Sequence, residues 1–297
     1  FKGAMFPWES DDYGEESTPT FALTGPLEHH ITADISIACW NYYCLTRDGQ
    51  WLRTKAFPLM KAVADFWVSR VTRNDDGSYS ICNVVGADEY ANGVDDNAFT
   101  NGAAIRALEY ACEAARICNE PVPEIWEEVG KGIRILRFKD GVTREHATYN
   151  GEMIKQADVN LLGYPLYFVG DAESQKKDME YYVDKIDPQN GPAMSYSVFC
   201  VQYARMGDAK RAYEMFCRCY QPNLRAPFGV LAETPTSDNP YFMPGAGGLV
   251  QVVINGFCGL QIMDGGVEQL SSVLPAHWKK VTVKGVGPEK KMYVRER

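Results

Sequence analysis

The sequence has no long hydrophobic run and no concentration of basic residues. None of its apolar segments approaches the roughly 20 residues that a membrane-spanning helix needs, so we expect no membrane span. The formal net charge is -9, and the 30 lysines and arginines are dispersed along the chain. Because a nucleic-acid backbone attracts clustered positive charge, neither nucleic acid nor a membrane is an expected partner.

The sequence also has little that could hold a metal or a cofactor. Its four histidines do not form a metal-ligand set, and Cys217 and Cys219 are separated by one residue, closer than zinc-binding pairs usually are. The glycines at 245, 247 and 248 follow no strand, so they do not match a dinucleotide fingerprint. The nine cysteines are an odd number, and several lie on apolar helix faces, so we expect buried free thiols. No metal and no cofactor are expected.

What the chain does have is ordinary globular composition with many aromatic rings. Of its 297 residues 45% are hydrophobic and 23% charged, enough for a large core. Aromatic residues make up 12%, and tryptophans and tyrosines often stand beside acids in expected loops. Sugars pack their C–H faces on rings and bond their hydroxyls to carboxylates and amides. The composition therefore favours a small carbohydrate as the partner.

An acidic loop at residues 86–101 is the most informative stretch. Four acids fall within nine residues there, just before a helical pattern. Asp96 or Asn97 is expected to cap that helix, because side-chain oxygens accept the free N–H groups of a first turn. Capping does not explain Asp88, Glu89 and Tyr90. A protonated carboxyl group beside a ring that covers a sugar face is typical of a sugar-cleaving site.

Two other pairs have chemistry that suits a sugar. Trp8 and Glu9 offer a ring and a hydrogen-bond acceptor, although a packed tryptophan beside a solvated acid is the simpler interpretation. Lys155 and Gln156 offer a cation and an amide, although an exposed lysine at a helix start is the simpler interpretation. The residues alone leave both alternatives open.

Apolar residues recur at helical spacing through most of the chain, which predicts an all-α fold. We expect helices near residues 31–45, 57–71, 105–115 and 124–136, then a hairpin of two helices in which Asp208 caps the second. Repeated hairpins closing in a ring form an (α/α)6 toroid, and the helices counted cover only its later part. After residue 265 an alternating pattern predicts a β-rich appendage. The expected domains are a catalytic barrel lacking its N-terminal part, 1–265, and the start of a β domain, 266–297.

Four motifs together resemble glycoside hydrolase family 65, whose members have an (α/α)6 barrel. They lie at residues 3–10, 28–35, 88–101 and 155–159, in the order of the family. The resemblance implies that Glu89 is the general acid, with Asp88 and Tyr90 beside it. It also implies that Trp8, Glu9, Lys155 and Gln156 hold the glucosyl unit, and that His30 and Thr32 lie near the aglycone. Ala91 departs from the histidine that many members have there.

The later part of the chain resembles the hydrolase branch of this family, which includes kojibiose hydrolase and protein-glucosylgalactosylhydroxylysine glucosidase. The His-Ser element with which the phosphorylases bind phosphate is absent, and Glu233 stands in the corresponding region. A carboxylate repels phosphate but can deprotonate water, so the resemblance implies that Glu233 is the general base. The expected activity is inverting hydrolysis of an α-glucosyl disaccharide or glycoconjugate, with a kojibiose-type linkage favoured.

Two alternatives remain at this point. One is an inverting disaccharide phosphorylase of the same family. The other is a non-catalytic carbohydrate-binding remnant, because the upstream Trp-Asp segment with which the family binds the cleaved sugar lies outside this sequence. We therefore also expect a missing N-terminal portion or a companion chain to supply that segment.

Overall fold

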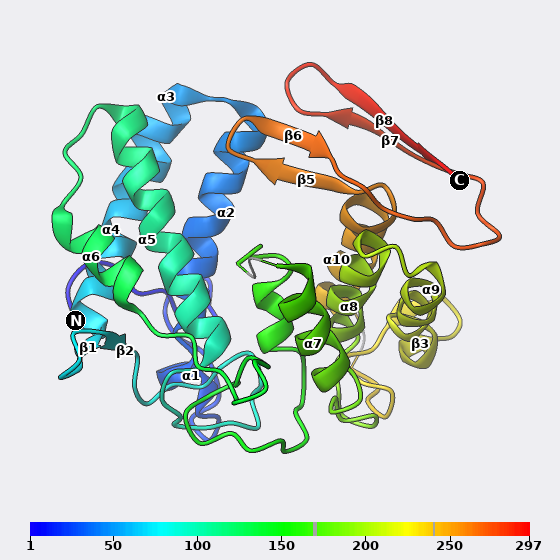
Figure 1. The fold of residues 1–297 in the computed structure, drawn as a ribbon, viewed down its shortest axis with the longest axis horizontal. Helices are drawn as coiled ribbons and strands as arrows, with labels where there is room; N and C mark the ends of the chain where they lie inside the picture. Colours follow the sequence, from blue (N-terminus) through cyan, green and yellow to red (C-terminus); the bar gives the residue numbers. More distant parts are fainter. Residues whose placement is uncertain (169–170, 240) are drawn as a thin grey trace. The chain divides into compact units, whose positions relative to one another are not determined.

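Helices make up most of the regular structure in the computed structural model, which describes residues 1–168, 171–239 and 241–297 (Figure 1). The strands within these ranges form four two-stranded antiparallel sheets. The mainly helical class predicted from the sequence is thus confirmed. The chain forms two units, the first with Phe1–Tyr43 and Arg47–Asn150, the second with Cys44–Thr46 and Gly151–Arg297. The predicted domain boundary at residue 265 stays a prediction.

The first unit contains most of the long helices, and α4 packs against α5 and α6 (Figure 1). Its elements are α1 (Thr24–Leu27), α2 (His30–Thr46), α3 (Gly49–Trp51), the π-helical turn η1 (Leu52–Ala56), α4 (Phe57–Arg70), β1 (Thr72–Arg73), β2 (Tyr79–Ser80), α5 (Ala98–Cys118) and α6 (Glu124–Gly132).

The start of α5 confirms the predicted cap. The Asn97 side chain accepts a hydrogen bond from the Thr100 N–H and satisfies a free donor of the first turn. Asp96 instead lies buried and forms an ion pair with Arg134. Helix α6 begins at Glu124 as predicted but ends at Gly132, because Ile133 turns extended and bridges Tyr79.

The second unit consists of shorter helices and small hairpins. Its elements are the 3-10 turn η2 (Val159–Leu162), α7 (Ala172–Tyr182), α8 (Met194–Arg205), α9 (Ala209–Arg218), the 3-10 turn η3 (Gln221–Asn223), β3 (Leu224–Arg225), β4 (Val230–Leu231), α10 (Met243–Gln251), the π-helical turn η4 (Val252–Phe257), β5 (Leu260–Met263), β6 (Gly266–Gln269), β7 (Lys280–Val286) and β8 (Lys291–Glu296).

Helix α8 is the centre of the second unit, since it packs against α9, α10 and η4. The predicted hairpin of α8 and α9 is confirmed, with the Asp208 side chain accepting from the Arg211 N–H. Gly248 explains the close approach of α10 to α8, because a Cβ there would lie 2.6 Å from the Ser197 hydroxyl oxygen.

The C-terminal β pattern is confirmed in its register. Val283 pairs with Tyr293, and Thr282 pairs with Val294, in the antiparallel sheet of β7 and β8. In the described part of the chain no disulfide links any of the nine cysteines. Within the same ranges, no helix has the length and apolar character that crossing a membrane requires.

Candidate active site

The Asp88–Glu89–Tyr90 segment forms a turn in the first unit. Asp88 is 2% exposed, and its Oδ1 accepts the Tyr90 N–H at 3.2 Å, while its carbonyl accepts the Ala91 N–H at 3.1 Å. Asp88 therefore shapes the turn from inside. Glu89 is half-buried and Tyr90 is 45% exposed, so both side chains reach the surface of the unit.

The base of this loop is closed by hydrogen bonds between residues on its two sides. Val84 and Val94 exchange both main-chain hydrogen bonds at 2.9 Å, and the Asn83 N–H donates to Asp95 Oδ1 at 2.8 Å. The buried Arg70 donates from Nη2 to the Cys82 carbonyl at 2.6 Å. The segment that carries Glu89 is thus a closed loop on a fixed base, which suits a catalytic side chain.

Trp8 and Glu9 lie on an irregular segment whose main chain is held by one carboxylate. Glu16 accepts the Trp8 N–H at 2.6 Å, the Glu9 N–H at 3.2 Å, and both the N–H and the hydroxyl of Thr18 at 2.9 and 2.5 Å. Burial raises the pKa of Glu16, but these four hydrogen bonds outweigh it and lower the pKa. Glu16 was not predicted as part of the site.

The Trp8 ring packs edge-on against His30, with centroids 5.5 Å apart. His30 is buried, and its Nδ1 lies 2.7 Å from Asp34 Oδ2 while its Nε2 lies 2.8 Å from Glu28 Oε1. Burial lowers the pKa of the imidazole, but the Asp34 and Glu28 carboxylates outweigh it and raise the pKa to about 10. His30 is therefore an imidazolium whose two N–H groups are both donated to carboxylates. Its predicted aglycone contact stays a prediction, and the ring itself supports Trp8.

Thr32 is fully buried in α2, and its hydroxyl oxygen accepts the Phe6 N–H at 2.9 Å. This bond ties the N-terminal segment to α2, two residues before Trp8. Gly3 lets the same segment lie close to α4, since a Cβ there would overlap the Ala62 carbonyl oxygen. The observed role of Thr32 is structural, and its predicted place near the aglycone stays a prediction.

In the second unit the structure brings Lys155 and Glu233 together. Lys155 Nζ lies 3.7 Å from Glu233 Oε1, and the two side chains are 18% and 30% exposed. An ammonium group at this distance attracts the carboxylate and can orient it. The two residues are 78 positions apart in the sequence, and no sequence pattern predicts that they form a pair.

The segment that carries Lys155 and Gln156 is fixed on both sides. Ile154 donates to the Lys185 carbonyl at 2.9 Å and accepts from the Asp187 N–H at 2.8 Å. The Ala157 N–H donates to the Ser195 hydroxyl at 3.1 Å. Gln156 itself is 7% exposed, so only a small part of its side chain reaches solvent in this unit.

The sequence missed the residues that hold the predicted ones. Glu28 and Asp34, which hold His30, lie inside the motif at residues 28–35 but were given no role there. Glu16, which holds the Trp8 main chain, lies outside the motifs, and only its negative charge signals it. Among the described residues, no group of three or more histidines, cysteines and acids is arranged to hold a metal ion. The binding and catalytic roles of the predicted residues stay predictions.

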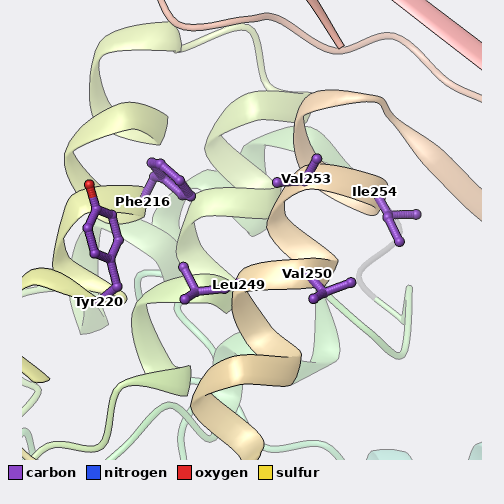
Figure 2. Close-up of a pocket in the computed structure, with 6 residues that line it drawn as sticks. All are labelled: Phe216, Tyr220, Leu249, Val250, Val253 and Ile254. Atoms are coloured by element: carbon purple, nitrogen blue, oxygen red, sulfur yellow. The ribbon is translucent and has the colours of Figure 1, made fainter. Parts of the chain in front are cut away.

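A pocket of about 530 Å³ in the second unit lies apart from the predicted residues of that unit. Figure 2 shows its walls, which come from the end of α9 and from α10 and η4, and all its lining groups are apolar except one tyrosine hydroxyl. The lining residues are Phe216, Tyr220, Leu249, Val250, Val253 and Ile254. Because a sugar needs hydrogen-bonding partners for its hydroxyls, this pocket is not a sugar site.

Comparisons with known proteins agree with the residue patterns. The family model described as "Glycosyl hydrolase family 65 central catalytic domain" matches residues 1–149. A kojibiose hydrolase from Mucilaginibacter mallensis is 52% identical over 294 residues, which are 99% of this chain and 44% of that protein. A protein-glucosylgalactosylhydroxylysine glucosidase from Dictyostelium discoideum is 40% identical over 275 residues, which are 90% of this chain and 38% of that protein.

A solved structure described as a kojibiose phosphorylase candidate from the human microbiome has a TM-score of 0.75 at 17% identity, covering 98% of this chain and 48% of that one. At that identity the likeness concerns the fold alone. The chain spans less than half the length of these relatives. The family model covers half of the chain and the relatives nearly all of it, so the chain belongs to glycoside hydrolase family 65 and resembles its hydrolase branch.

Proposed function

We propose that the protein is an inverting α-glucosidase that releases glucose from an α-glucosyl disaccharide or glycoconjugate, with a kojibiose-type linkage as the favoured substrate. The observation that carries this proposal is the 52% identity to a kojibiose hydrolase across 99% of the chain. The adjacent Lys155 and Glu233 side chains add support, because the phosphorylase reaction has no use for a carboxylate base.

The reaction uses two carboxyl groups in different protonation states. Glu89 donates its proton to the glycosidic oxygen as the bond to the anomeric carbon breaks. Glu233 takes a proton from the water that attacks the same carbon from the opposite face, so an α-glucoside gives β-glucose. An inverting pair of carboxyl groups is separated by about 6.5 to 9.5 Å to admit that water.

The remaining predicted residues bind the sugar. The Trp8 ring covers one face of the glucosyl unit, and Glu9, Lys155 and Gln156 bond its hydroxyls. The Tyr90 ring, which is 45% exposed, lies beside the acid, and the buried Asp88 keeps the turn in place. Ala91, which is smaller than histidine, leaves more room near the aglycone.

The fold of the whole protein is part of the proposal. We assign residues 1–265 to the later part of an (α/α)6 toroid and residues 266–297 to the start of a β domain. The helical hairpins of the chain and its likeness to a solved structure at a TM-score of 0.75 support this assignment. Relatives of more than twice the length support a further segment outside this sequence that completes the sugar site.

The test is a product analysis with the intact protein. Kojibiose in phosphate-free buffer should give β-glucose as the first product in proton NMR spectra, before mutarotation. Glu89→Gln and Glu233→Gln should each lower kcat by orders of magnitude, with a smaller effect on KM. Turnover that requires phosphate and yields glucose 1-phosphate would indicate a phosphorylase instead. Sugar binding without turnover, unchanged in Glu89→Gln, would indicate a binding protein.

A further inference from the structure

The side chain of Arg225 donates to five main-chain carbonyls, three of them in the segment that follows Glu233. Arg225 ends strand β3, and its side chain is 25% exposed. Its Nη1 donates to carbonyls of the preceding turn, and its Nη2 donates to three carbonyls within four residues after Glu233. The acceptors are Pro222 and Leu224 at 3.0 and 3.2 Å, then Thr234, Pro235 and Ser237 at 3.2, 2.8 and 2.7 Å.

Asn223 binds the same loop from its other side. Its carboxamide is 2% exposed, and Nδ2 donates to the Ala232 carbonyl at 3.1 Å and to the Glu233 carbonyl at 2.9 Å. The Ala232 N–H returns a hydrogen bond to the Asn223 carbonyl at 2.9 Å, and the Ala193 N–H donates to the Glu233 carbonyl at 3.1 Å. The main chain of Glu233 is thus fixed from two directions.

Such bonds matter because the loop after β4 has no helix or strand to fix it. Residues 232–239 are irregular, so their carbonyls find donors on side chains instead of in a ladder. A guanidinium group presents several N–H donors in a fixed plane, which lets one side chain set the directions of several carbonyls at once. A shift of about 1 Å in a reacting group can reduce a rate about a hundredfold.

We propose that Asn223 and Arg225 are positioning residues for Glu233, which hold its main chain so that its carboxylate meets the attacking water. This inference rests on the proposed function, in which Glu233 is the general base. Neither residue touches the substrate in this role. Both act through the main-chain carbonyls of the loop, whereas Lys155 lies next to the side-chain carboxylate of Glu233.

The test compares kcat with sugar affinity in the intact protein. Arg225→Lys keeps the positive charge but loses the fork of donors, and Asn223→Asp keeps the shape but loses both donated bonds. Each should lower kcat for kojibiose about 10- to 100-fold. In a Glu89→Gln background, which prevents turnover, the same changes should leave the kojibiose Kd, measured by calorimetry, within about threefold, because the sugar-binding side chains are unchanged.

Arg211→Ala is the matched control, since Arg211 lies on α9 of the same unit and its ion pairs are with Glu180 and Asp208. It should leave kcat unchanged. Guanidinium added at millimolar concentration should restore part of the activity of Arg225→Ala and none of that of Glu233→Gln. Far-UV circular dichroism and Tm identify any variant that fails to fold. If one of Arg225→Lys and Asn223→Asp does not fold, the kcat and Kd of the other test the positioning role.

Two results separate the inference from the proposed function. If Glu233→Gln is inactive while Arg225→Lys and Asn223→Asp both keep full kcat, the positioning role is overturned and the base assignment stands. Loss of kojibiose affinity in parallel with kcat would also overturn it, because that pattern indicates general damage to the loop. If Glu233→Gln keeps full activity, the base assignment itself is wrong.

Discussion

The Lys155 ammonium nitrogen lies 3.7 Å from the Glu233 carboxylate oxygen, inside the second unit. Family resemblance assigns the two residues separately, one to sugar binding and the other to catalysis. Their proximity indicates that the cation also acts on the proposed base, because a positive neighbour attracts the carboxylate and directs its oxygen. Removing Lys155 should therefore affect both binding and the chemical step.

Lys155→Met should lower kcat/KM for kojibiose about 10- to 100-fold, since a charge-assisted contact of this kind contributes roughly 1.5 to 3 kcal/mol. The loss should appear in kcat as well as in KM, and steady-state kinetics with the intact protein measures both. Lys176→Met is the control, because Lys176 is an exposed lysine of α7 in the same unit and its ion pair is with Glu180. A change in KM alone would mean that Lys155 only binds sugar.

Glu16 should matter for substrate binding although it is exposed. Its carboxylate accepts the N–H groups of Trp8 and Glu9, so Glu16→Ala frees the main chain that carries the proposed sugar contact. We expect KM for kojibiose to rise about tenfold with a smaller change in kcat, since the loss is in ground-state binding. Trp8 fluorescence should report the same loosening without substrate.

The neighbouring Glu15→Gln is the matched control for this prediction. Glu15 is also an exposed acid, but its main chain makes its bonds to the loop: its carbonyl accepts the Asp11 N–H, and its N–H donates to Asp11 Oδ1. Equal KM values in Glu16→Ala and the unaltered protein would show that the Trp8 segment holds its position without Glu16, or that it does not bind the sugar.

Local signals in the sequence were enough for much of the fold. The capping side chains of Asn97 and Asp208 each accept an N–H from the third residue after them. Both partners therefore lie within four consecutive residues, and the sequence alone predicts the cap. Helix α7 was missed because its surface is largely polar and its apolar stripe is weak. The helix is stabilised instead by ion pairs between residues four apart, Lys177 with Glu173 at 3.1 Å and Lys176 with Glu180 at 3.8 Å.

The candidate site was predictable only where its chemistry lies in short motifs. Trp8 and Glu89 stand in such motifs, and the family resemblance identifies them. Glu16, Asn223 and Arg225 bind main-chain N–H or carbonyl groups. Because almost every residue has these groups, the residue types in the sequence do not show which ones will be bound. Loop conformation alone selects those partners, and no periodic pattern encodes it.

His29 should make the first unit less stable in acid. Its Nδ1 accepts from Arg70 Nε at 3.1 Å and its Nε2 donates to the Pro26 carbonyl at 2.9 Å, so the folded ring is neutral. Burial lowers its pKa, and the positive charges of Arg70 and His30 lower it further. Its contribution is therefore present above the unfolded pKa of about 6.5 and lost as pH falls below that value.

Denaturant unfolding of the protein and of His29→Gln at several pH values measures this contribution. The difference in unfolding free energy between the two should shrink between pH 6.5 and pH 5. Since Arg70 also holds the Cys82 carbonyl at the base of the Glu89 loop, amide exchange in that loop should quicken over the same range. A difference that stays constant with pH would contradict a neutral His29.

His30 should have the opposite dependence, because its folded pKa is raised from 6.5 to about 10. Its ring faces the Asp34 and Glu28 carboxylates and the rings of Trp8 and Phe99. A raised folded pKa contributes stability that is complete below about 6.5 and is lost as pH rises through 10. The advantage of the protein over His30→Gln in unfolding free energy should therefore be largest near pH 6 and shrink up to pH 10.

Titration of the imidazole by NMR gives the direct measurement. A folded-state midpoint near 6.5 would mean that the two carboxylates do not hold His30 as a cation. Ion pairs would then not fix the ring against which Trp8 packs.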